Sequence, residues 1–573
     1  MVLGATDVAT TGAAPARAGT AAAGTAASDH IATPRWAKVL DQSRCIGCHA
    51  CTTACKSEND VPLGVSRTYV KSVDVGVCPQ VRRAFQVTRC NQCDNPPCVT
   101  ACPTGAMHRR DDGIVDFDKK LCIGCKACIA ACPYDAIFIN PEDHAAEKCN
   151  FCAQRLDIGL EPACVVVCPT EAILVGNLDD PSSKVAQMIH RQAVTVRRPE
   201  KETHPKLYYK GAHQATLDPI AARRSEGGTF MWSQIREGHN VVNSGHPGAG
   251  HSSWRGSDTR HARWYGKALG HSKTLGHGKT LGHGKGHGHG GNSSAAALLS
   301  YDVGHSIPWG FEVSLYTWTK GLAAGAMLVP LVLVLAGQIS WQSVLLRVVG
   351  PAVAVGFLGL TGVVLIADLD RPQRFYLLFT HPQTKSWLVR GGFIIGAYGA
   401  VLVAALGAGI ARFELGEQLL AGPALLAALG TAVYTAYLFA QAKARDLWQT
   451  PLLAPHLIVQ AVMVGAGILL PFAAGLAPGA LHPLEVLVAG AAIVHVAFVF
   501  GETTVSHATA HAHLAVAEMT RGRYAVAFWL GVLLVTVGVL APFLGWWAGI
   551  VALVGLLPHE HAYVQSGQSV ALA

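Results

Sequence analysis

The sequence predicts a protein of two unlike halves, a cysteine-rich α+β double domain and an all-α bundle of about eight transmembrane helices, joined by a disordered linker. All 17 cysteines lie between Cys45 and Cys168. A polar segment rich in glycine and histidine follows them. After Ile307, apolar stretches long enough to cross a bilayer recur almost to the end of the chain. With 573 residues the chain is also too long for one compact core, so several domains are expected.

The composition excludes a purely soluble protein. Half of the residues are apolar and only 14% are charged, whereas roughly 25% are charged in ordinary soluble domains. The mean hydropathy of +0.31 points the same way. The formal net charge of +8 is modest and spread along the chain, so no nucleic-acid partner is expected.

The part of the sequence that precedes the membrane half divides by composition. Residues 1–35 are rich in Ala, Gly and Thr without a continuous apolar run, which predicts a disordered tail; a cleaved targeting peptide is the alternative. Residues 36–181 form the cysteine-rich region. Residues 182–305 are polar and contain LGHSKT, LGHGKT and LGHGKG from Leu269, which predicts a linker because such sequence cannot bury a core. Transient metal binding by the histidines of this tract is the alternative.

Residues 306–560 are predicted to form the transmembrane domain, followed by a short tail over 561–573. Serial apolar runs separated by short polar loops do not fit one large soluble core. The predicted spans are 313–337, 344–368, 387–411, 419–441, 453–476, 484–503, 525–540 and a shorter one near 541–557.

Loop charge predicts the orientation of these spans in a bacterial inner membrane. If the chain before the first span lies in the cytoplasm, the loops on the cytoplasmic side carry seven basic residues. They are Arg371, Arg374, Lys385, Lys443, Arg445, Arg521 and Arg523. The outside loops then carry Arg412, and Arg347 if the second span starts late. This excess of basic residues predicts that the cysteine-rich region lies on the cytoplasmic side. Two further arguments agree with it: the chain lacks a signal-like apolar run, and the reducing cytosol suits free thiolates.

Sixteen of the cysteines fall into four groups of four that have the spacing of metal ligands. Disulfides between neighbours this close would be strained. The first and third groups are nearly the same eleven-residue segment, CIGCHACTTAC and CIGCKACIAAC, which indicates an internal duplication. The groups are Cys45, Cys48, Cys51 and Cys55; Cys90, Cys93, Cys98 and Cys102; Cys122, Cys125, Cys128 and Cys132; and Cys149, Cys152, Cys164 and Cys168.

The three-cysteine runs favour [4Fe–4S] clusters over other metals. Three thiolates in a tight loop wrap one corner of a cubane, and the following cysteine turns away to ligate the other cluster of a pair. Proline follows the fourth cysteine at Pro103, Pro133 and Pro169, while Lys56 takes this place in the first group. Structural zinc is the alternative, but it does not account for the runs or the prolines. Sixteen thiolates predict four clusters, and Cys78 is left as a buried structural thiol.

On these motifs, residues 41–181 resemble the four-cluster electron-transfer subunit of the dimethyl-sulfoxide-reductase family of molybdenum enzymes, which implies two ferredoxin-like lobes. The resemblance rests on CNQCDNPPCVTACPTGAM, DDGIVDFDKKLCIGCKACIAACPYDAI and KCNFCAQRLDIGLEPACVVVCPTEAI. It implies that each cluster takes three cysteines from one group and one from another. The implied sets are Cys45, Cys48 and Cys51 with Cys168; Cys149, Cys152 and Cys164 with Cys55; Cys90, Cys93 and Cys98 with Cys132; and Cys122, Cys125 and Cys128 with Cys102.

The membrane half carries a second resemblance. The segments ADLDRPQRF (Ala367–Phe375) and RDLWQTPLLAP (Arg445–Pro455) are similar to the polysulfide-reductase membrane subunit, the NrfD type, and the likeness covers about 308–560. It implies eight helices that hold no haem and that oxidise or reduce quinones beside an iron–sulfur subunit. The two subunits are usually separate chains, and here they are fused around a histidine-rich insert.

Five residues are candidates to contact the quinone, whether ubiquinone or menaquinone. A quinone changes its protonation with its redox state, so its pocket needs groups that exchange protons. Glu312, Tyr316 and Lys320 recur at four-residue spacing and therefore share one face of the first helix. A lysine inside a span costs roughly 2.5–3.5 kcal/mol on insertion scales, so Lys320 needs a partner or a wet cavity. Asp368 and Tyr434 complete the set.

Two other interpretations concern residues near this set. Asp368 could instead form a structural ion-pair cluster at a helix end with Arg371 and Arg374. Haem is not expected, because no second histidine is predicted at the depth of His495. Three further histidines are predicted to lie in a loop, namely His507, His511 and His513.

Together these features predict the iron–sulfur and quinone-reactive subunit of a molybdopterin oxidoreductase complex. Electrons would pass between a partner's molybdenum or tungsten bis-molybdopterin centre, four clusters and a membrane quinone. The sequence holds no molybdenum-binding motif, so the site that converts a sulfur oxyanion, polysulfide, formate or sulfoxide is expected on a partner chain. One alternative is a relay between quinol and a cytochrome or ferredoxin without molybdenum. Another is metal transport with a sensing histidine loop, which the lack of repeated ligand pairs near mid-membrane disfavours.

Overall fold

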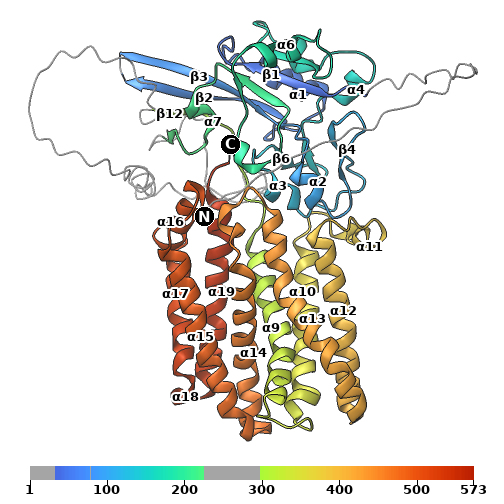
Figure 1. Cartoon of the computed structure of the whole chain (residues 1–573), viewed down its shortest axis with the longest axis vertical. Coiled ribbons are helices and arrows are strands. Elements are labelled where there is room, and N and C mark those ends of the chain that lie inside the picture. The colour runs from blue at the N-terminus through green and yellow to red at the C-terminus, as the bar shows by residue number, and fades with distance from the viewer. Residues whose placement is uncertain (1–32, 78, 225–296, 573) are drawn as a thin grey trace, which may run out of the picture.

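The structure is a computed structural model that describes residues 33–77, 79–224 and 297–572. A domain that holds the cysteines sits on one end of a long helical bundle (Figure 1). We call residues 33–224 together with the strand at Leu298–Tyr301 the cysteine domain, and residues 311–569 the membrane bundle. This arrangement confirms the predicted fold class. Cys78, the repeat from Leu269 and the first 32 residues lie outside the described residues.

In its described part, the cysteine domain is built on two four-stranded sheets. In the first sheet, β1 (Trp36–Asp41) pairs antiparallel with β8 (Ile173–Asn177) and parallel with β10 (Leu207–Lys210). The short β9 (Val194–Thr195) lies beside β10 at the edge. Strands from both ends of the domain therefore close one lobe around the cysteine groups.

The second sheet is formed by a long hairpin and two later segments. β2 (Thr68–Val77) and β3 (Gln80–Arg89) form the hairpin, and β12 (Leu298–Tyr301) adds antiparallel to β2. β11 (Arg223–Arg224) pairs parallel with β12. The chain that leaves the sheet at β11 therefore returns to it, next to its own point of departure, before it enters the membrane bundle.

The remaining elements of the cysteine domain are short, because turns and cysteine loops interrupt every apolar run. Two small hairpins are β4 (Met107–Arg109) with β5 (Val115–Phe117), and β6 (Ile137–Ile139) with β7 (Ala146–Lys148). The helices are α1 (Ala50–Glu58), α2 (Pro97–Ala101), α3 (Ala127–Ala131), α4 (Ala153–Leu156), α5 (Ala163–Val166), α6 (Lys184–Arg191), the 3-10 turn η1 (Pro199–Lys201) and α7 (Gln214–Leu217).

The two duplicated cysteine segments share one backbone conformation. Gly47 and Gly124 have φ angles of 70° and 72°, and His49 and Lys126 have φ angles of 60° and 59°. Glycine enters this left-handed region at little cost. A Cβ on Gly124 would lie only 2.7 Å from the Cβ of Asp370. The same tight turn that converges the thiols therefore lets the cysteine domain approach the membrane bundle.

The predicted linker over 182–305 is too long. α6, β9, β10 and α7 belong to the cysteine domain, and Leu207 and Tyr209 of β10 are 2% and 1% exposed. These elements are short and lie among charged residues, so the polar composition of the whole segment hid them. The folded cysteine domain therefore reaches Arg224, and residues 225–296 lie outside the described residues.

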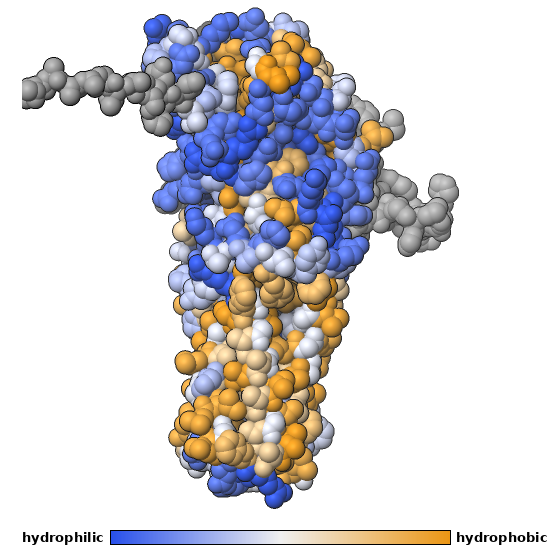
Figure 2. Space-filling view, turned by 90° about the vertical axis from the view of Figure 1, so that its right-hand side faces the viewer, coloured by the Kyte–Doolittle hydropathy of each residue, from blue (hydrophilic) through white to orange (hydrophobic). Residues whose placement is uncertain are grey.

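Seven of the described helices are long and apolar enough to cross a membrane. They are α9 (Phe311–Leu335); η3 (Leu345–Val349) with α10 (Gly350–Ala367); α12 (Trp387–Ile410); α13 (Glu414–Gln441); α14 (Leu453–Leu476); η6 (Pro478–Ala480) with α15 (Leu481–Thr504); and α17 (Ala525–Val537) with η7 (Gly538–Leu540) and α18 (Ala541–Leu544). Shorter elements between them are η4 (Pro372–Arg374), α11 (Leu377–Thr380), η5 (Asp446–Gln449) and α16 (Ala510–Thr520). Hydrophobic residues cover the bundle between the hydrophilic cysteine domain and a hydrophilic tip (Figure 2).

A helix is present at the eighth predicted span, with different bounds, but it is not among the seven. α19 (Trp546–Ser569) begins after Gly545 and packs along α17 (Figure 1). We predicted its end near residue 557 and a tail over 561–573, because polar residues interrupt the apolar run there. In the structure these polar residues are buried inside the bundle, with His559 at 1% and Gln565 at 6% exposure. The predicted tail is therefore mostly the last part of a packed helix.

α9 lies at the centre of the bundle and packs against α10, α13, α14 and α19. Its contact with α14 is a contact of backbones. A Cβ added to Gly465 of α14 would lie 2.2 Å from the carbonyl carbon of Gly325 of α9. Small residues at such crossings let transmembrane helices approach closely.

Replacement of Gly465 by alanine should destabilise the bundle. We expect a loss of roughly 1–3 kcal/mol from overpacking, partly offset by about 1 kcal/mol of helix propensity. Unfolding by SDS in mixed micelles, followed by circular dichroism, measures the change. Gly475→Ala is the matched control on the same helix, because its added Cβ has no atom within 4 Å. Equal losses in both variants would contradict the backbone contact.

Candidate metal centres and cofactor cavity

Among the described residues, twelve of the grouped cysteines line three small cavities. Each cavity brings three cysteines of one group together with one from another group. The lining sets are Cys45, Cys48, Cys51 and Cys168; Cys90, Cys93, Cys98 and Cys132; and Cys102, Cys122, Cys125 and Cys128. The sixteen cysteines in the described part of the chain are free rather than joined in disulfides.

The other four cysteines, Cys55, Cys149, Cys152 and Cys164, lie together where α1 meets α5. Asn59 contacts two of them, since its Nδ2 lies 3.7 Å from Cys55 Sγ and 3.9 Å from Cys152 Sγ. Arg89 Nη1 donates to Cys164 Sγ at 2.9 Å. Lys38 Nζ lies 3.9 Å from the same sulfur. This group therefore has two cations directly beside its sulfur atoms.

The two cations favour negative charge on this group. Arg89 is 1% exposed and Lys38 is 2% exposed. Burial raises the pKa of the Cys55 thiol to about 12. Burial also opposes ionisation of Cys164, but Arg89 and Lys38 outweigh it and lower the pKa of this thiol to about 7. Nε and Nη2 of Arg89 have no hydrogen-bond partner among the described residues, so this buried guanidinium fits an anionic metal–thiolate group.

Backbone amides also point at the cysteine sulfur atoms. The N–H of Met107 donates to Cys102 Sγ at 3.3 Å, and the N–H of Ala172 donates to Cys168 Sγ at 3.2 Å. A neutral thiol is a weak acceptor, whereas a metal-bound thiolate is a strong one. Hydrogen bonds of this kind tune the reduction potentials of iron–sulfur clusters. The donor set of the cavities therefore fits clusters bound by thiolates.

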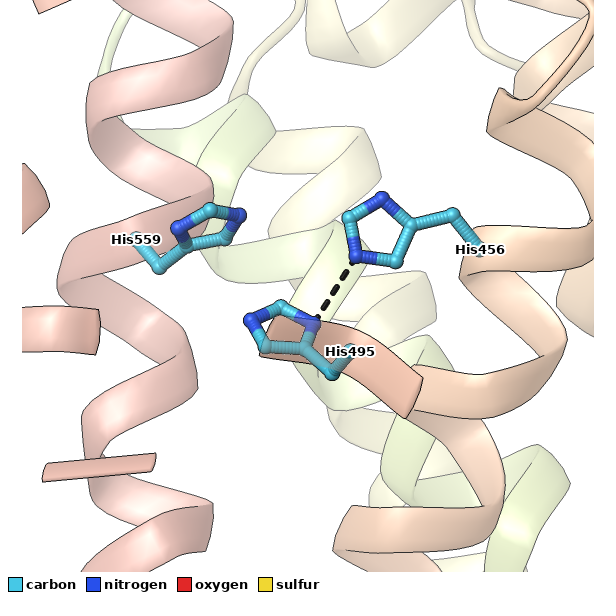
Figure 3. A group of neighbouring side chains, drawn as sticks. All are labelled: His456, His495 and His559. Atoms are coloured by element: carbon cyan, nitrogen blue, oxygen red, sulfur yellow. Dashed lines mark hydrogen bonds between the residues drawn. The ribbon is translucent and has the colours of Figure 1, made fainter. Parts of the chain in front are cut away.

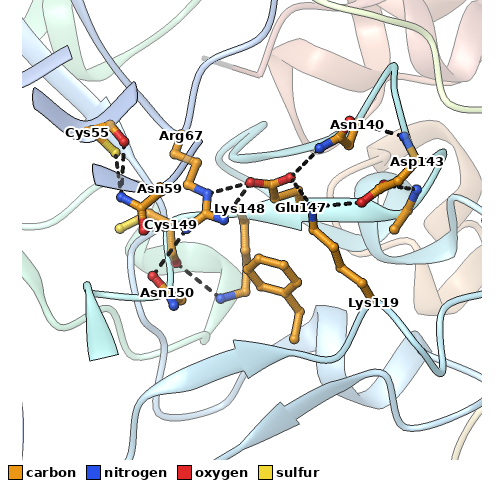
Figure 4. A network of polar contacts seen from close by, with 12 residues as sticks. Cys55, Asn59, Arg67, Lys119, Asn140, Asp143, Glu147, Lys148, Cys149 and Asn150 are labelled. Carbon is orange, nitrogen blue, oxygen red and sulfur yellow. Dashed lines mark hydrogen bonds and ion pairs between the residues drawn. The ribbon is translucent and has the colours of Figure 1, made fainter. Parts of the chain in front are cut away.

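A buried polar network connects the cysteine groups to the side of the domain that faces the bundle (Figure 4). Arg67 Nε donates to Glu147 Oε1 at 2.7 Å, and these side chains are 8% and 1% exposed. Glu147 also accepts from Asn140 at 2.8 Å and pairs with Lys119 at 3.0 Å. At the other end, Arg67 donates to Asn59 at 2.8 Å. Loss of one member would leave a buried charge unpaired, so the network holds the loops in one arrangement.

Two arginines of the ADLDRPQRF segment attach the bundle to the cysteine domain. Arg371 Nη1 donates to the Lys119 carbonyl at 2.6 Å. Arg374 Nη1 donates to the carbonyls of Lys119 and Lys120 at 3.0 and 2.7 Å. The side chain of Arg371 also pairs with Asp143 at 3.4 Å. Both arginines are therefore engaged with the cysteine domain, in contrast to the predicted alternative of an ion-pair cluster with Asp368.

A cavity of about 590 Å³ lies at the junction of the two halves. Its lining comes from both of them and includes Lys126, Trp309, Glu312, Asp368 and Asp370. Trp309 Nε1 donates to the carbonyl of Cys125 at 3.2 Å. One wall of the cavity is thereby joined to a cysteine of the third group.

Carboxylates gather on the bundle side of this cavity. Lys126 Nζ lies 3.9 Å from Asp368 Oδ1 and 3.2 Å from Asp370 Oδ1. Burial raises the pKa of Asp368 to about 7; Lys126 opposes this rise, and the charges of Glu312 and Asp370 add to it. A carboxyl group with a pKa near neutrality can take up and release protons at physiological pH.

A histidine held between two carboxylates also lines the cavity. His305 contacts the carboxylate of Asp135, and its Nε2 lies 3.3 Å from Asp302 Oδ2. Burial lowers the pKa of His305, but the two carboxylates outweigh burial and raise it to about 10. Sequence reasoning missed this group because it assigned His305 to the linker.

Three of the five predicted quinone-contact residues lie deeper in the bundle than the cavity. Lys320 Nζ donates to Thr435 Oγ1 at 2.7 Å and lies 4.9 Å from the centre of the Tyr434 ring. Tyr316, one helical turn before Lys320, is 2% exposed. Lys320 thus has the partners that a lysine in a span requires. The other two predicted residues, the carboxylates, line the cavity.

Sequence reasoning missed Trp309 and Gln565, which also line the cavity. Trp309 lies just before the first predicted span, and Gln565 falls in the predicted tail. Gln565 Nε2 donates to the carbonyls of Trp309 and Gly310 at 3.1 and 3.0 Å. The polar run after Leu557 was the available signal, because polar residues on a helix among apolar spans are functional candidates by default.

The expectation that no histidine lies at the depth of His495 is wrong. His456 of α14 and His559 of α19 lie beside it, and His456 Nε2 is 2.8 Å from His495 Nδ1 (Figure 3). The three residues are far apart in sequence, so spacing did not reveal their contact. His511 and His513 lie on α16 rather than in a loop, whereas His507 lies in a loop as predicted. His511 contacts Arg198 of the cysteine domain.

Three protein families match this chain. A 4Fe-4S dicluster domain matches residues 81–178, and a 4Fe-4S binding domain matches residues 36–57. The family described as polysulphide reductase, NrfD, matches residues 301–548. The cysteine domain and the membrane bundle thus match separate families.

Curated relatives match the cysteine domain. A tetrathionate reductase subunit of Salmonella typhimurium is 41% identical over 234 residues, which are 40% of this chain and 92% of the relative. The thiosulfate reductase electron transfer subunit PhsB of Salmonella typhi is 44% identical over 186 residues, 32% of this chain and 96% of the relative. A polysulfide reductase chain of Wolinella succinogenes is 42% identical over 177 residues, 30% of this chain and 93% of the relative.

Proposed function

This protein belongs to the family of 4Fe-4S electron-transfer subunits of reductase complexes, fused here to an NrfD-type membrane subunit, and from this premise we propose that it relays electrons between a molybdopterin partner and membrane quinone. The observation that carries the proposal is the cavity at the junction. It joins the Cys125 loop, through Trp309, to the carboxylates Glu312 and Asp368 of the bundle. Such a cavity suits a ligand that exchanges both electrons and protons.

The proposed ligand sets for four [4Fe–4S] clusters follow the grouping of the cysteines. In three of the four sets the cysteines line one small cavity per set, and in the fourth set Cys164 accepts from the partly unpaired Arg89 guanidinium. When bound, each cluster supplies the uptake and release of single electrons. The proposed sets are Cys45, Cys48, Cys51 and Cys168; Cys90, Cys93, Cys98 and Cys132; Cys122, Cys125, Cys128 and Cys102; and Cys149, Cys152, Cys164 and Cys55.

For a quinone in the junction cavity, the residues of the chain supply the proton chemistry. Asp368 takes up and returns the proton that accompanies each change in quinone redox state. Lys126 balances the charge of Asp368 and Asp370. Oδ2 of Asp370 is buried with no hydrogen-bond partner among the described residues, which fits a ligand that donates a hydrogen bond here. Lys320, Tyr316 and Tyr434 do not line the cavity, so we assign the proton exchange to the carboxylates instead.

Replacement of Asp368 by asparagine should slow the reduction of the clusters by a quinol roughly a hundredfold or more, because asparagine cannot accept a proton. In the unmodified protein the rate should rise with pH through about 7, as Asp368 loses its proton and becomes a base. In the variant this rise should disappear. Anaerobic stopped-flow mixing with a soluble quinol analogue, followed by the absorbance of the clusters, measures both effects.

Two controls separate this effect from general damage. Dithionite, which needs no quinone site, should reduce the clusters of the variant at the normal rate. Asp179→Asn removes a carboxylate whose side chain is 56% exposed on the cysteine domain, and it should leave the quinol rate unchanged. A normal rate and pH profile in Asp368→Asn would contradict the proposed role.

We also propose that the cysteine domain lies on the cytoplasmic side of the bacterial inner membrane. The loops next to this domain carry the seven basic residues counted above, and the far side carries Arg412 and Arg347. Arg347 is paired with Glu414 and Glu417 at 3.2 and 3.0 Å, which reduces the positive charge of the far side further.

Protease should therefore degrade the cysteine domain in inside-out vesicles and spare it in right-side-out vesicles. The reverse pattern would place the domain on the outer side.

The partner is tested by gentle purification of the full chain from membranes with metal analysis. Molybdenum or tungsten, a large co-purifying subunit and about sixteen irons per chain are expected from four clusters and a bis-molybdopterin partner. Iron without molybdenum or tungsten, together with haem on the partner, would favour the relay between quinol and a cytochrome. About four zinc ions per chain with little iron would overturn the proposed clusters.

A further inference from the structure

Three histidines from three different helices meet inside the membrane bundle. His456 lies on α14, His495 on α15 and His559 on α19, and their side chains point toward one another (Figure 3). They are 5%, 0% and 1% exposed. No lining residue of the junction cavity belongs to this trio, and the electron relay proposed above does not use it. We call these residues the histidine cluster.

The geometry of the histidine cluster suits a metal ion. One ring nitrogen of each residue lies within 4.8 Å of those of the other two. A tetrahedral ion with metal–nitrogen distances of about 2.0–2.1 Å separates its ligand nitrogens by about 3.3 Å. His456 Nε2 and His495 Nδ1 are 2.8 Å apart and would spread slightly. Rotation of the His559 ring would close the remaining gap.

The cluster is short of hydrogen bonds for such a buried site. Each neutral imidazole has one donor and one acceptor nitrogen. The structure pairs His456 with His495, but His495 Nε2 and His559 Nδ1 are buried without a hydrogen-bond partner among the described residues. A buried polar atom without a partner destabilises the folded state. The hydrogen bond between His456 and His495 therefore leaves polar atoms of the cluster unpaired, and a metal ion coordinated by one nitrogen of each ring would give all three residues a common partner.

Two aromatic side chains pack against the cluster. The Phe498 ring stacks on His456 with ring centres 5.1 Å apart, and the Phe528 ring lies 5.6 Å from the centre of His559. The direct contact between His456 and His495 leaves no room for a porphyrin between these two rings. The surroundings therefore fit a bare ion rather than a haem.

We propose that His456, His495 and His559 bind one divalent transition-metal ion with an open fourth position, a site that ties α14, α15 and α19 together. Three neutral imidazoles suit Zn²⁺, Cu²⁺ and Ni²⁺ rather than Mg²⁺ or Ca²⁺. Three histidine nitrogens with a fourth exchangeable ligand are also a familiar zinc coordination. The site is independent of the identity of the partner subunit and of the quinone.

The test uses the full chain without an oligohistidine tag and with residues 269–291 deleted. That deletion is needed because the repeat contains five histidines that would bind metal on their own. The membrane-purified protein is washed with chelator and then equilibrated with Zn²⁺. We expect one zinc per chain after gel filtration, with the iron content unchanged. X-ray absorption at the zinc edge should show three or more nitrogen or oxygen ligands at about 2.0–2.1 Å.

Variants assign the zinc to the histidine cluster. His495→Gln should lose the zinc and keep the iron. Two matched controls should keep both metals: His482→Gln on the same helix, where the side chain is 78% exposed, and His561→Gln next to the cluster on α19. Zinc with sulfur ligands at about 2.3 Å would mean that it occupies cysteine sites and would overturn the proposal. The absence of bound zinc, or an equal amount of zinc in His495→Gln, would also overturn the proposal. If a variant fails to fold, the X-ray absorption spectrum of the protein with all three histidines still tests the proposal.

Discussion

The close approach between the third cysteine loop and the ADLDRPQRF segment is the contact on which the rest of the structure depends. Gly124 at φ 72° removes the side chain that would collide with Asp370. Arg371 and Arg374 then bind backbone carbonyls of residues 119 and 120. Because these acceptors are backbone carbonyl groups, this part of the contact depends on the backbone conformation of the loop. A one-residue shift of either loop would break the contact.

Charge pairing makes the docking of the cysteine domain on the membrane bundle specific. Lys126 of the cysteine domain faces Asp368 and Asp370 of the bundle, and His305 is held between Asp135 and Asp302. Partly buried pairs of this kind add little net stability, since desolvation offsets their attraction. Wrong pairings would leave charges buried and unpaired, which costs several kcal/mol. The pairs therefore select one docking geometry out of many that an apolar interface would tolerate.

The sequence predicted the elements that carry strong local patterns. Cysteine spacing predicted the groups, twelve of whose members the structure brings together in three cavities, and apolar length identified the transmembrane half. The predicted bounds were wrong where the average composition of a segment did not reflect its structure. Residues 184–210 fold despite their polar composition, and α19 continues through a polar stretch because the bundle buries it. Contacts between residues that are far apart in the sequence could not be predicted either. His456, His495 and His559 come from three helices, and only tertiary packing brings their rings together.

The pairing of β11 with β12 changes the meaning of the histidine-rich insert. Arg223 and Leu298 are neighbours in one sheet, so the chain departs and returns at almost the same point. The insert therefore leaves from and returns to neighbouring strands of one sheet, and its length does not set the distance between the cysteine domain and the bundle. Loop-closure entropy changes by only about 0.6 kcal/mol for each doubling of length. Evolution could lengthen, shorten or recompose residues 225–296 without moving any candidate cluster relative to the membrane.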